Sequence, residues 1–212
     1  MHYLQNYEGA ITAYSSAIEL APSNARAHNN RARSFNAIAK HYDALEDLNE
    51  AIKIEPNDSD YLMNRGNTNR YLNHFTEALG DYEAALSINP QHGYAWHNLA
   101  NLFVVLGRES EAIAAYTHAI AGGIFEALGG RAHALAEAGL VEQALKDLDE
   151  LLTKAPLYLP ARRYRAMLYV KIGQVKLAIV ELEKAYAQDP NHEVTRTMLL
   201  DAKALVERKP SR

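Results

Sequence analysis

Apolar residues recur at steps of three and four along most of the chain, the spacing of one face of an α-helix. Between Ala95 and Leu106 this face consists of Trp96, Leu99, Phe103 and Leu106. Gly107 follows, a residue suited to the left-handed turn that ends many helices. A second apolar face comes next, made of Ala112, Ile113, Tyr116, Ala119 and Ile120. The pattern predicts two helices joined by a short turn, and it predicts no strand.

This helix pair recurs along the chain every 34 residues, with one interval shortened to 32. Two columns are nearly all alanine: Ala10, Ala44, Ala78, Ala112, Ala144 and Ala178, and then Ala17, Ala51, Ala85, Ala119, Leu151 and Ala185. A third column is proline, at Pro22, Pro56, Pro90, Pro156 and Pro190, with Ile124 in the remaining slot. A fourth column holds small residues, at Ala32, Gly66, Ala100, Ala132 and Ala166. Proline cannot continue a helix, and small residues let two helices cross closely. The turn between the helices holds residues that tolerate a positive φ, at Asn73, Gly107, Gly139 and Gly173.

One unit carries a family pattern almost completely: Trp96-x-x-Leu99-Ala100-x-x-Phe103, then Gly107, Ala112, Tyr116 and Ala119. The chain resembles tetratricopeptide-repeat (TPR) proteins over essentially its whole length. The resemblance implies an all-α fold, a right-handed α-solenoid (superhelix) of TPR helix-turn-helix repeats with a C-terminal capping helix. We expect a single domain, 1–212, with a partial repeat at 1–24, full repeats at 25–58, 59–92, 93–124, 125–158 and 159–192, and a capping helix and tail at 193–212.

The two ends of the repeat array carry further expectations. The first unit is predicted to contain only its second helix, about Glu8–Leu20, with a remnant of the first. Such a half-unit leaves an apolar face uncovered, so we expect a chain that is excised from a longer protein or that lacks disordered residues. Glu193–Glu207 is predicted to form a polar-faced helix, because a solenoid needs such a helix at its end to stay soluble.

Two charged columns predict a structural role. Arg31, Arg65, Arg131 and Arg165 share one position of the first helix, and Asp47, Asp81, Asp147 and Glu181 share one position of the second helix, sixteen residues later. Where the arginine is replaced, by Leu99, the acid is replaced as well, by Ala115. We expect an ion pair between the two helices of each repeat, with an apolar pair in its place once. These arginines are therefore not ligand-binding candidates.

The shortened interval contains Gly122-Gly123, and the next helix carries Gly129-Gly130 in its interior. Each interior glycine costs about 1 kcal/mol relative to alanine. A hinge or a floor for a ligand backbone is one interpretation of these glycines. A tolerated deletion that only alters the superhelical pitch is the other.

Composition narrows the function without naming it. The net charge is −4 and there is no cysteine, which disfavours nucleic acid as a partner and excludes disulfides and thiolate zinc sites. No stretch is long enough to span a bilayer and no secretion signal stands at the N-terminus, so we expect no direct membrane insertion and a cytoplasmic protein. No catalytic motif is present, so the prediction is a non-enzyme with no cofactor and no metal. His97 and His133, on neighbouring first helices, are two nitrogen ligands at most and do not complete a metal site.

The remaining candidate surface is the concave face that first helices line in TPR-like proteins. Two asparagine ladders run along it at intervals of 34, Asn30, Asn64 and Asn98, and Asn67 and Asn101. A carboxamide both donates and accepts, so such a row can pair with the backbone of an extended peptide. Packing against a neighbouring repeat is the alternative reading of the same ladders.

Charge refines this candidate surface. Basic groove positions (Arg26, Arg33, Arg70, Arg163 and Lys171) outnumber acidic ones (Asp60, Glu126 and Glu137), which favours an acidic segment. Asn30-Arg31-Ala32 resembles a stretch of TPR co-chaperones that clamp a C-terminal carboxylate, but Asn29, Met63 and His97 stand where the first clamp lysine belongs. The ladder is more similar to the peptide-threading superhelix of glycosyltransferase-type TPR proteins.

The sequence thus predicts a scaffold or adaptor that binds an extended, possibly acidic, segment of another protein. The predicted peptide-binding residues are Asn30, Arg33, Asn64, Asn67, Arg70, Tyr71, Tyr94, His97, Asn98 and Asn101. The alternative is a structural module that forms a homo-oligomer through its groove or its exposed N-terminal helix.

Overall fold

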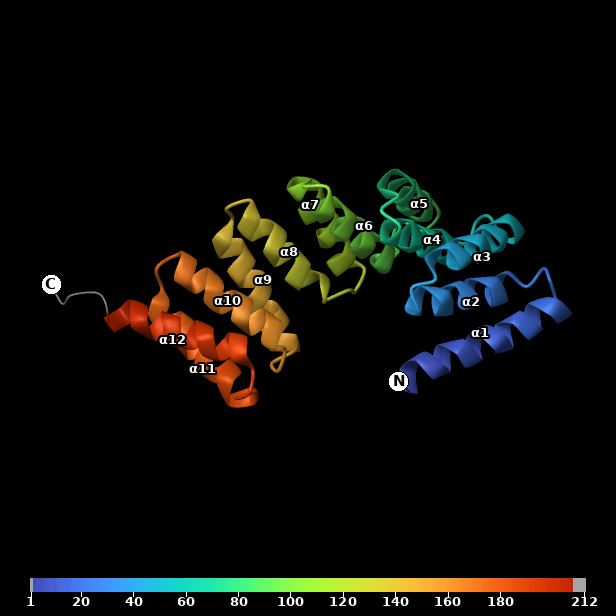
Figure 1. Cartoon of the computed structure of the whole chain (residues 1–212). Helices are drawn as coiled ribbons and strands as arrows, with labels where there is room; N and C mark the ends of the chain where they lie inside the picture. Colours follow the sequence, from blue (N-terminus) through green and yellow to red (C-terminus); the bar gives the residue numbers. More distant parts are fainter. Residues whose placement is uncertain (1, 208–212) are drawn as a thin grey trace. The chain divides into compact units, whose positions relative to one another are not determined.

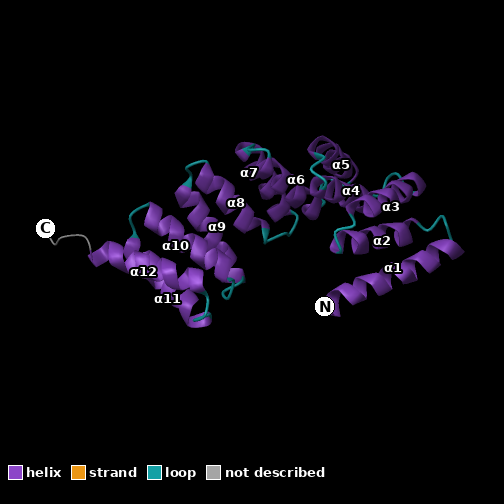
Figure 2. Ribbon diagram, viewed as in Figure 1, coloured by secondary structure: helices purple, strands orange, loops and turns teal. Residues whose placement is uncertain are grey.

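The computed structural model describes residues 2–207, and within them every regular element is an α-helix (Figures 1 and 2). The helices are α1 (His2–Leu20), α2 (Ala25–Ala37), α3 (His41–Ile54), α4 (Ser59–Tyr71), α5 (Phe75–Ile88), α6 (Gly93–Val105), α7 (Glu109–Ala121), α8 (Ala127–Glu137), α9 (Val141–Lys154), α10 (Leu159–Lys171), α11 (Val175–Gln188) and α12 (Glu193–Glu207). The chain is therefore an all-α repeat protein, as its periodicity predicts.

The helices form two compact units. Unit 1 contains the residues up to Arg108 together with Ala121–Ile124, and unit 2 contains Glu109–Ile120 together with the residues from Phe125 onward. In unit 1, α2 packs against α3 and α4 packs against α5; in unit 2, α8 packs against α9 and α10 against α11. The assignment of residues 1–212 to a single domain stays a prediction.

The repeating small residues lie where the helices of a pair meet. Ala32, Ala100, Ala132 and Ala166 have no exposed surface. At Gly66 even a methyl group is too large, because a Cβ there would lie 2.7 Å from the ring of Tyr82. Gly130 is constrained in the same way, since its Cβ would lie 2.4 Å from Tyr116. Close packing of α8 on α7 therefore explains this interior glycine without a hinge or a ligand.

The turns between paired helices have the predicted backbone conformation. Asn73, Gly107, Gly139 and Gly173 all have a positive φ, between 61° and 80°. The equivalent turn after α2 contains Ala39, whose φ of 60° places an alanine in the left-handed region. Sequence reasoning missed this position, because alanine does not favour that conformation.

The first and last helices differ in how well they match the bounds expected from the sequence. Helix α1 begins at His2, so the expected start at Glu8 and the separate remnant of an earlier helix are wrong: one continuous helix covers both. Helix α12 has the expected bounds and packs on α11 through Leu199 and Ala202, while Lys203 pairs with Glu183 at 2.9 Å. Leu200 occupies the next position of the small-residue column and is 59% exposed.

Candidate functional site

Two neighbouring cavities lie on the first-helix face of unit 1. One, of about 280 Å³, is lined by α2 and α4 through Arg33, Asn36, Ala37, Asn64, Asn67 and Tyr71. The other, of about 290 Å³, is lined by α1 and α2 through Tyr7, Tyr14, Asn30, Arg33, Ser34 and Ala37. Arg33 and Ala37 line both cavities. The structure therefore brings together five of the predicted binding residues: Asn30, Arg33, Asn64, Asn67 and Tyr71.

Arg33 is the cation of this surface. Its side chain is exposed, and within residues 2–207 no carboxylate forms an ion pair with it. It differs in this respect from Arg31, two residues earlier, which is fully engaged by Asp47. The helical repeat separates these two roles, because residues two apart point to different sides of a helix.

Several asparagines of the groove already hold neighbouring helices together. Asn64 Nδ2 donates to Asn29 Oδ1 at 2.8 Å, which joins α4 to α2. Asn67 Oδ1 accepts a bond of 2.7 Å from the hydroxyl of Tyr82. Each amide keeps its other polar atom for a ligand, the carbonyl oxygen of Asn64 and the amino group of Asn67. Asn30 and Asn98 are half-buried and make no side-chain hydrogen bond to the rest of the described chain.

Arg70 and Tyr71 border the groove at the end of α4. The guanidinium of Arg70 lies 5.0 Å from the ring centroid of Tyr71, whose other neighbour is the stacked ring of His41 at 4.9 Å. Tyr71 lines the cavity and Arg70 does not. Burial raises the pKa of the nearby Tyr82 to about 12, with the positive charge of Arg70 opposing this shift.

The predicted residues of α6 are placed less closely around a cavity. Tyr94 is 61% exposed. His97 and Asn101 are half-buried and each has an interaction partner, and Asn98 is half-buried beside them. None of the four lines either cavity of unit 1.

All four expected arginine–acid pairs are in contact. Arg31 bonds Asp47 through two nitrogens at 2.7 Å each, and Arg131 bonds Asp147 at 2.8 and 2.7 Å. Arg65 bonds Asp81 at 2.6 Å. Arg165 reaches Glu181 with one nitrogen at 2.7 Å. The acids are nearly buried, so loss of an arginine leaves an uncompensated charge.

Each of these arginines also reaches back to the preceding second helix. Its Nη1 donates to one polar acceptor there, at Ser15, Asn49, Thr117 and Asp149 respectively. The arginine thus ties its own helix pair to the pair before it. The acceptor stands sixteen residues before the arginine in three cases and fourteen in the case of Thr117. This polar column was the signal in the sequence that could have predicted the second contact.

A further contact between repeats involves the closing proline. His28 Nε2 lies 3.1 Å from the carbonyl oxygen of Pro22, Trp96 Nε1 donates to that of Pro90 at 2.9 Å, and Arg162 donates to that of Pro156 at 2.7 Å. The three side chains share one position of the repeat. Sequence reasoning missed this contact because histidine, tryptophan and arginine have in common only a ring or guanidinium N–H.

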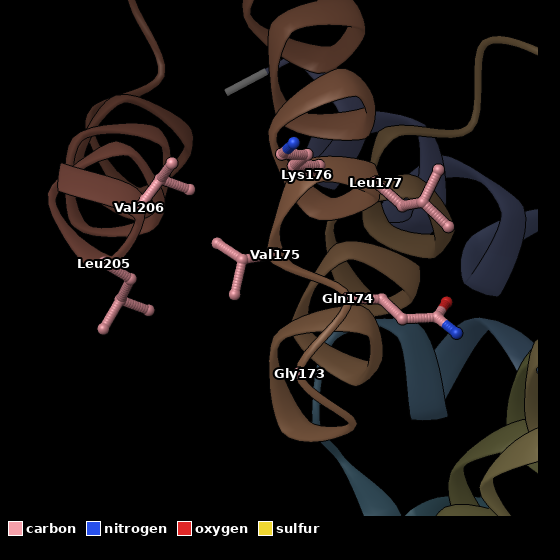
Figure 3. A pocket seen from close by; sticks show the side chains of 7 residues that line it. All are labelled: Gly173, Gln174, Val175, Lys176, Leu177, Leu205 and Val206. Atoms are coloured by element: carbon pink, nitrogen blue, oxygen red, sulfur yellow. The ribbon is translucent and has the colours of Figure 1, made fainter. Parts of the chain in front are cut away.

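Two cavities of unit 2 are lined mainly by apolar side chains. One, of about 430 Å³, lies between the start of α11 and the end of α12. Figure 3 shows Val175 on α11 pointing toward α12, which carries Leu205 and Val206, whereas Gln174 and Leu177 point away from α12. A smaller one, of about 170 Å³, lies among α8, α9 and α10 and is lined mostly by apolar and aromatic side chains.

Two further kinds of feature are absent from residues 2–207. No cluster of three or more histidine, aspartate or glutamate side chains suits a metal ion there. In the same part of the chain, no helix has the length and apolar character needed to cross a bilayer.

The paired helices define a class, the helical-hairpin repeat proteins. Comparison with protein families makes this specific. The tetratricopeptide repeat profile matches residues 63–127 and 130–193, and a related TPR repeat profile matches residues 2–36. The chain belongs to the tetratricopeptide repeat family. The comparison with curated proteins found no match.

Solved structures show the same fold at low sequence identity. YrrB, described as a TPR protein with an unusual peptide-binding site, has a TM-score of 0.69 and 22% identity, over 91% of this chain and 98% of YrrB. MamA of Desulfovibrio magneticus, from residue 41 to its end, has a TM-score of 0.71 and 16% identity, over 80% of this chain and 97% of that one. Yeast Tom70 has a TM-score of 0.73 and 16% identity, over 93% of this chain and 43% of Tom70.

Proposed function

We propose that this protein is a non-catalytic scaffold or adaptor whose unit 1 binds an extended, acidic segment of another protein. The observation that carries the proposal is Arg33, an exposed cation without an ion-pair partner in the described chain, which lines two adjoining cavities. An acidic side chain of the bound segment pairs with Arg33. The backbone of the segment pairs with Asn30, the oxygen of Asn64 and the amino group of Asn67.

Three further features support this proposal. The two cavities adjoin and share Arg33 and Ala37, which suits an extended chain better than a compact ligand. The peptide-binding site named for YrrB shows that a protein of this fold binds peptides. Tyr71, which contacts Arg70 and His41, offers an aromatic side chain at the edge of the cavity.

The test is a charge reversal with a matched control. The probe is a fluorescent peptide of alternating glutamate and serine, with an alternating lysine and serine peptide as the opposite charge. Arg33→Glu is expected to weaken binding of the acidic peptide about tenfold or more. Lys40→Glu changes the net charge equally at an exposed position outside the two cavities, and is expected to leave binding nearly unchanged. Equal binding by both variants, or tighter binding of the lysine peptide, would refute the proposal.

A second candidate function is self-association through α1. Ala10, Tyr14 and Ala17 are only partly buried, whereas their counterparts Ala44, Leu48 and Ala51 in α3 have no exposed surface. A second copy covering this face is expected to raise the mean mass as concentration increases over about a hundredfold range. Static light scattering measures this, and a constant monomer mass excludes it.

A further inference from the structure

The interior glycines of α8 have two different explanations. A Cβ at Gly130 would collide with Tyr116 at 2.4 Å, so packing requires a glycine there. A Cβ at Gly129 would meet only Leu151, at the ordinary contact distance of 3.5 Å. Alanine would fit at 129 and would favour the helix by about 1 kcal/mol. The packing of the protein therefore does not account for Gly129.

What Gly129 does is open a cavity. The cavity of about 170 Å³ among α8, α9 and α10 begins at Gly129, has Leu148 and Leu151 at its floor, and has His133 and Tyr164 beside it. The rings of His133 and Tyr164 stack, with centroids 5.6 Å apart and planes 19° from parallel. The equivalent positions in α2, α4 and α6 carry the side chains Asn29, Met63 and His97.

The size and lining of this cavity indicate what it holds. Pockets for drug-sized molecules measure about 300–1,000 Å³, so this one suits a single side chain. Its floor is leucine and its walls are aromatic rings, so the side chain is bulky and apolar.

Charge around the cavity indicates the neighbours of that side chain. Glu126 directly precedes α8, one turn before Gly129, and Glu137 lies one turn after His133. Both are exposed, and neither forms an ion pair with another described residue. On α10, Lys171 Nζ donates to the carbonyl oxygen of Ala136 at 3.4 Å, and Arg163 precedes Tyr164 in the sequence.

We infer that unit 2 contains an anchor site for a bulky apolar residue flanked by basic residues in a partner protein. The apolar side chain enters over Gly129 and contacts Leu148, Leu151 and Tyr164. The flanking cations pair with Glu126 and Glu137. This site is separate from the groove of unit 1 and prefers the opposite charge, so the two sites stand or fall independently.

The probe is a capped seven-residue peptide of glycine and serine with Lys-Leu-Lys at its centre. Two control peptides carry Lys-Ala-Lys and Glu-Leu-Glu. Binding is followed by amide chemical shifts of the whole isotope-labelled protein. The Lys-Leu-Lys peptide is expected to shift the resonances of Gly129, His133 and Tyr164. The alanine peptide is expected to bind about tenfold more weakly, because it loses the burial of a leucine side chain.

Two variants separate the cavity from a general effect on the helix. Gly129→Met installs the side chain found at the equivalent position of α4 and is expected to abolish the shifts. Gly80→Met makes the same change at a helical glycine with open space around it, and is expected to leave the shifts intact. Gly129→Ala fills less of the cavity and is measured as well, in case methionine disturbs folding. Equal binding of the leucine and alanine peptides, tighter binding of the Glu-Leu-Glu peptide, or unchanged binding by both Gly129 variants would overturn the inference.

Discussion

Ala39 shows how a single residue can be the exception in a repeating turn. Its φ of 60° places it in the left-handed region, where an L-residue with a Cβ is disfavoured by about 1–2 kcal/mol. The other turns of this kind use asparagine or glycine. Glycine avoids this cost, but its greater conformational freedom in the unfolded chain offsets part of the gain in stability. Ala39→Gly is therefore expected to raise the free energy of unfolding by about 0.5–1 kcal/mol, measured in urea.

The control for Ala39→Gly is the same change within a helix. Ala114 is exposed on α7, where glycine is expected to lower stability by about 1 kcal/mol. Changes of opposite sign in the free energy of unfolding would show that the effect of Ala39→Gly comes from the backbone conformation of the turn. A loss of stability in Ala39→Gly would show that the turn holds Ala39 without strain.

The arginine–acid contact acts at the scale of whole helices, because the guanidinium of one helix bonds side chains of two neighbouring helices. Arg131 of α8 bonds Asp147 of α9 and Thr117 of α7. Arg131→Leu leaves the carboxylate of Asp147, only 6% exposed, without its cation. The expected loss of stability is about 3–5 kcal/mol.

The same chain supplies the compensating change. Leu99 and Ala115 occupy the two positions in another repeat, and both are buried. The double variant Arg131→Leu/Asp147→Ala is therefore expected to be more stable than Arg131→Leu, by about 1–3 kcal/mol. A double-mutant cycle measures this coupling. Additive losses would mean that the pairing of these two columns carries no interaction energy.

Glu181 gives the last helix pair a defined pH dependence. Burial acts to raise its pKa, but the hydrogen bond and charge of Arg165, together with Lys184, outweigh it and lower the pKa below 4.5. A lowered folded-state pKa adds stability that is complete above pH 4.5 and is lost as the pH falls through the folded-state value. Glu181→Gln is expected to be less stable than wild type at neutral pH, with a difference that shrinks below pH 4.5.

Urea titrations between neutral and acidic pH measure this difference. Glu142→Gln, at an exposed position of α9, serves as the control for the substitution itself. A constant difference between Glu181→Gln and wild type at every pH would show that the amide substitution acts through packing and that Glu181 does not titrate.

Periodic features of the sequence predicted whole elements well. The helix pairs, the small crossing residues and the partner columns of Arg31 and Asp47 could all be derived by comparing repeats, because the same contact is made with the same residue types. Contacts made by different residue types at one position could not be derived in this way. The proline carbonyl accepts from His28, Trp96 and Arg162, and Asn64 bonds Asn29 across two repeats. The asparagines of this surface therefore bond neighbouring helices as well as being available to a ligand. The sequence alone does not show which polar atom of each amide is left without a partner.

At the scale of the whole molecule, repeat proteins distribute stability as a sum of neighbouring contacts. Within unit 1, α5 buries Ala78, Tyr82 and Ala85 completely, whereas the matching α1 residues Ala10, Tyr14 and Ala17 stay partly exposed. Protection from hydrogen exchange follows such burial. The amides of α1 are therefore expected to exchange about tenfold faster than those of α5, measured by mass spectrometry on peptides from each helix.

A pair of serines on α1 sharpens this experiment. Ser15 Oγ accepts a bond of 2.9 Å from Arg31, and Ser16 next to it is exposed. Ser15→Ala removes a tie between α1 and α2, so it is expected to speed exchange in α1 while leaving α5 unchanged. Ser16→Ala removes a similar group without that tie, and is expected to change neither helix. Equal protection of α1 and α5 would contradict this difference in exchange rate. If that protection increased with protein concentration, a second copy of the chain would be covering the exposed face of α1.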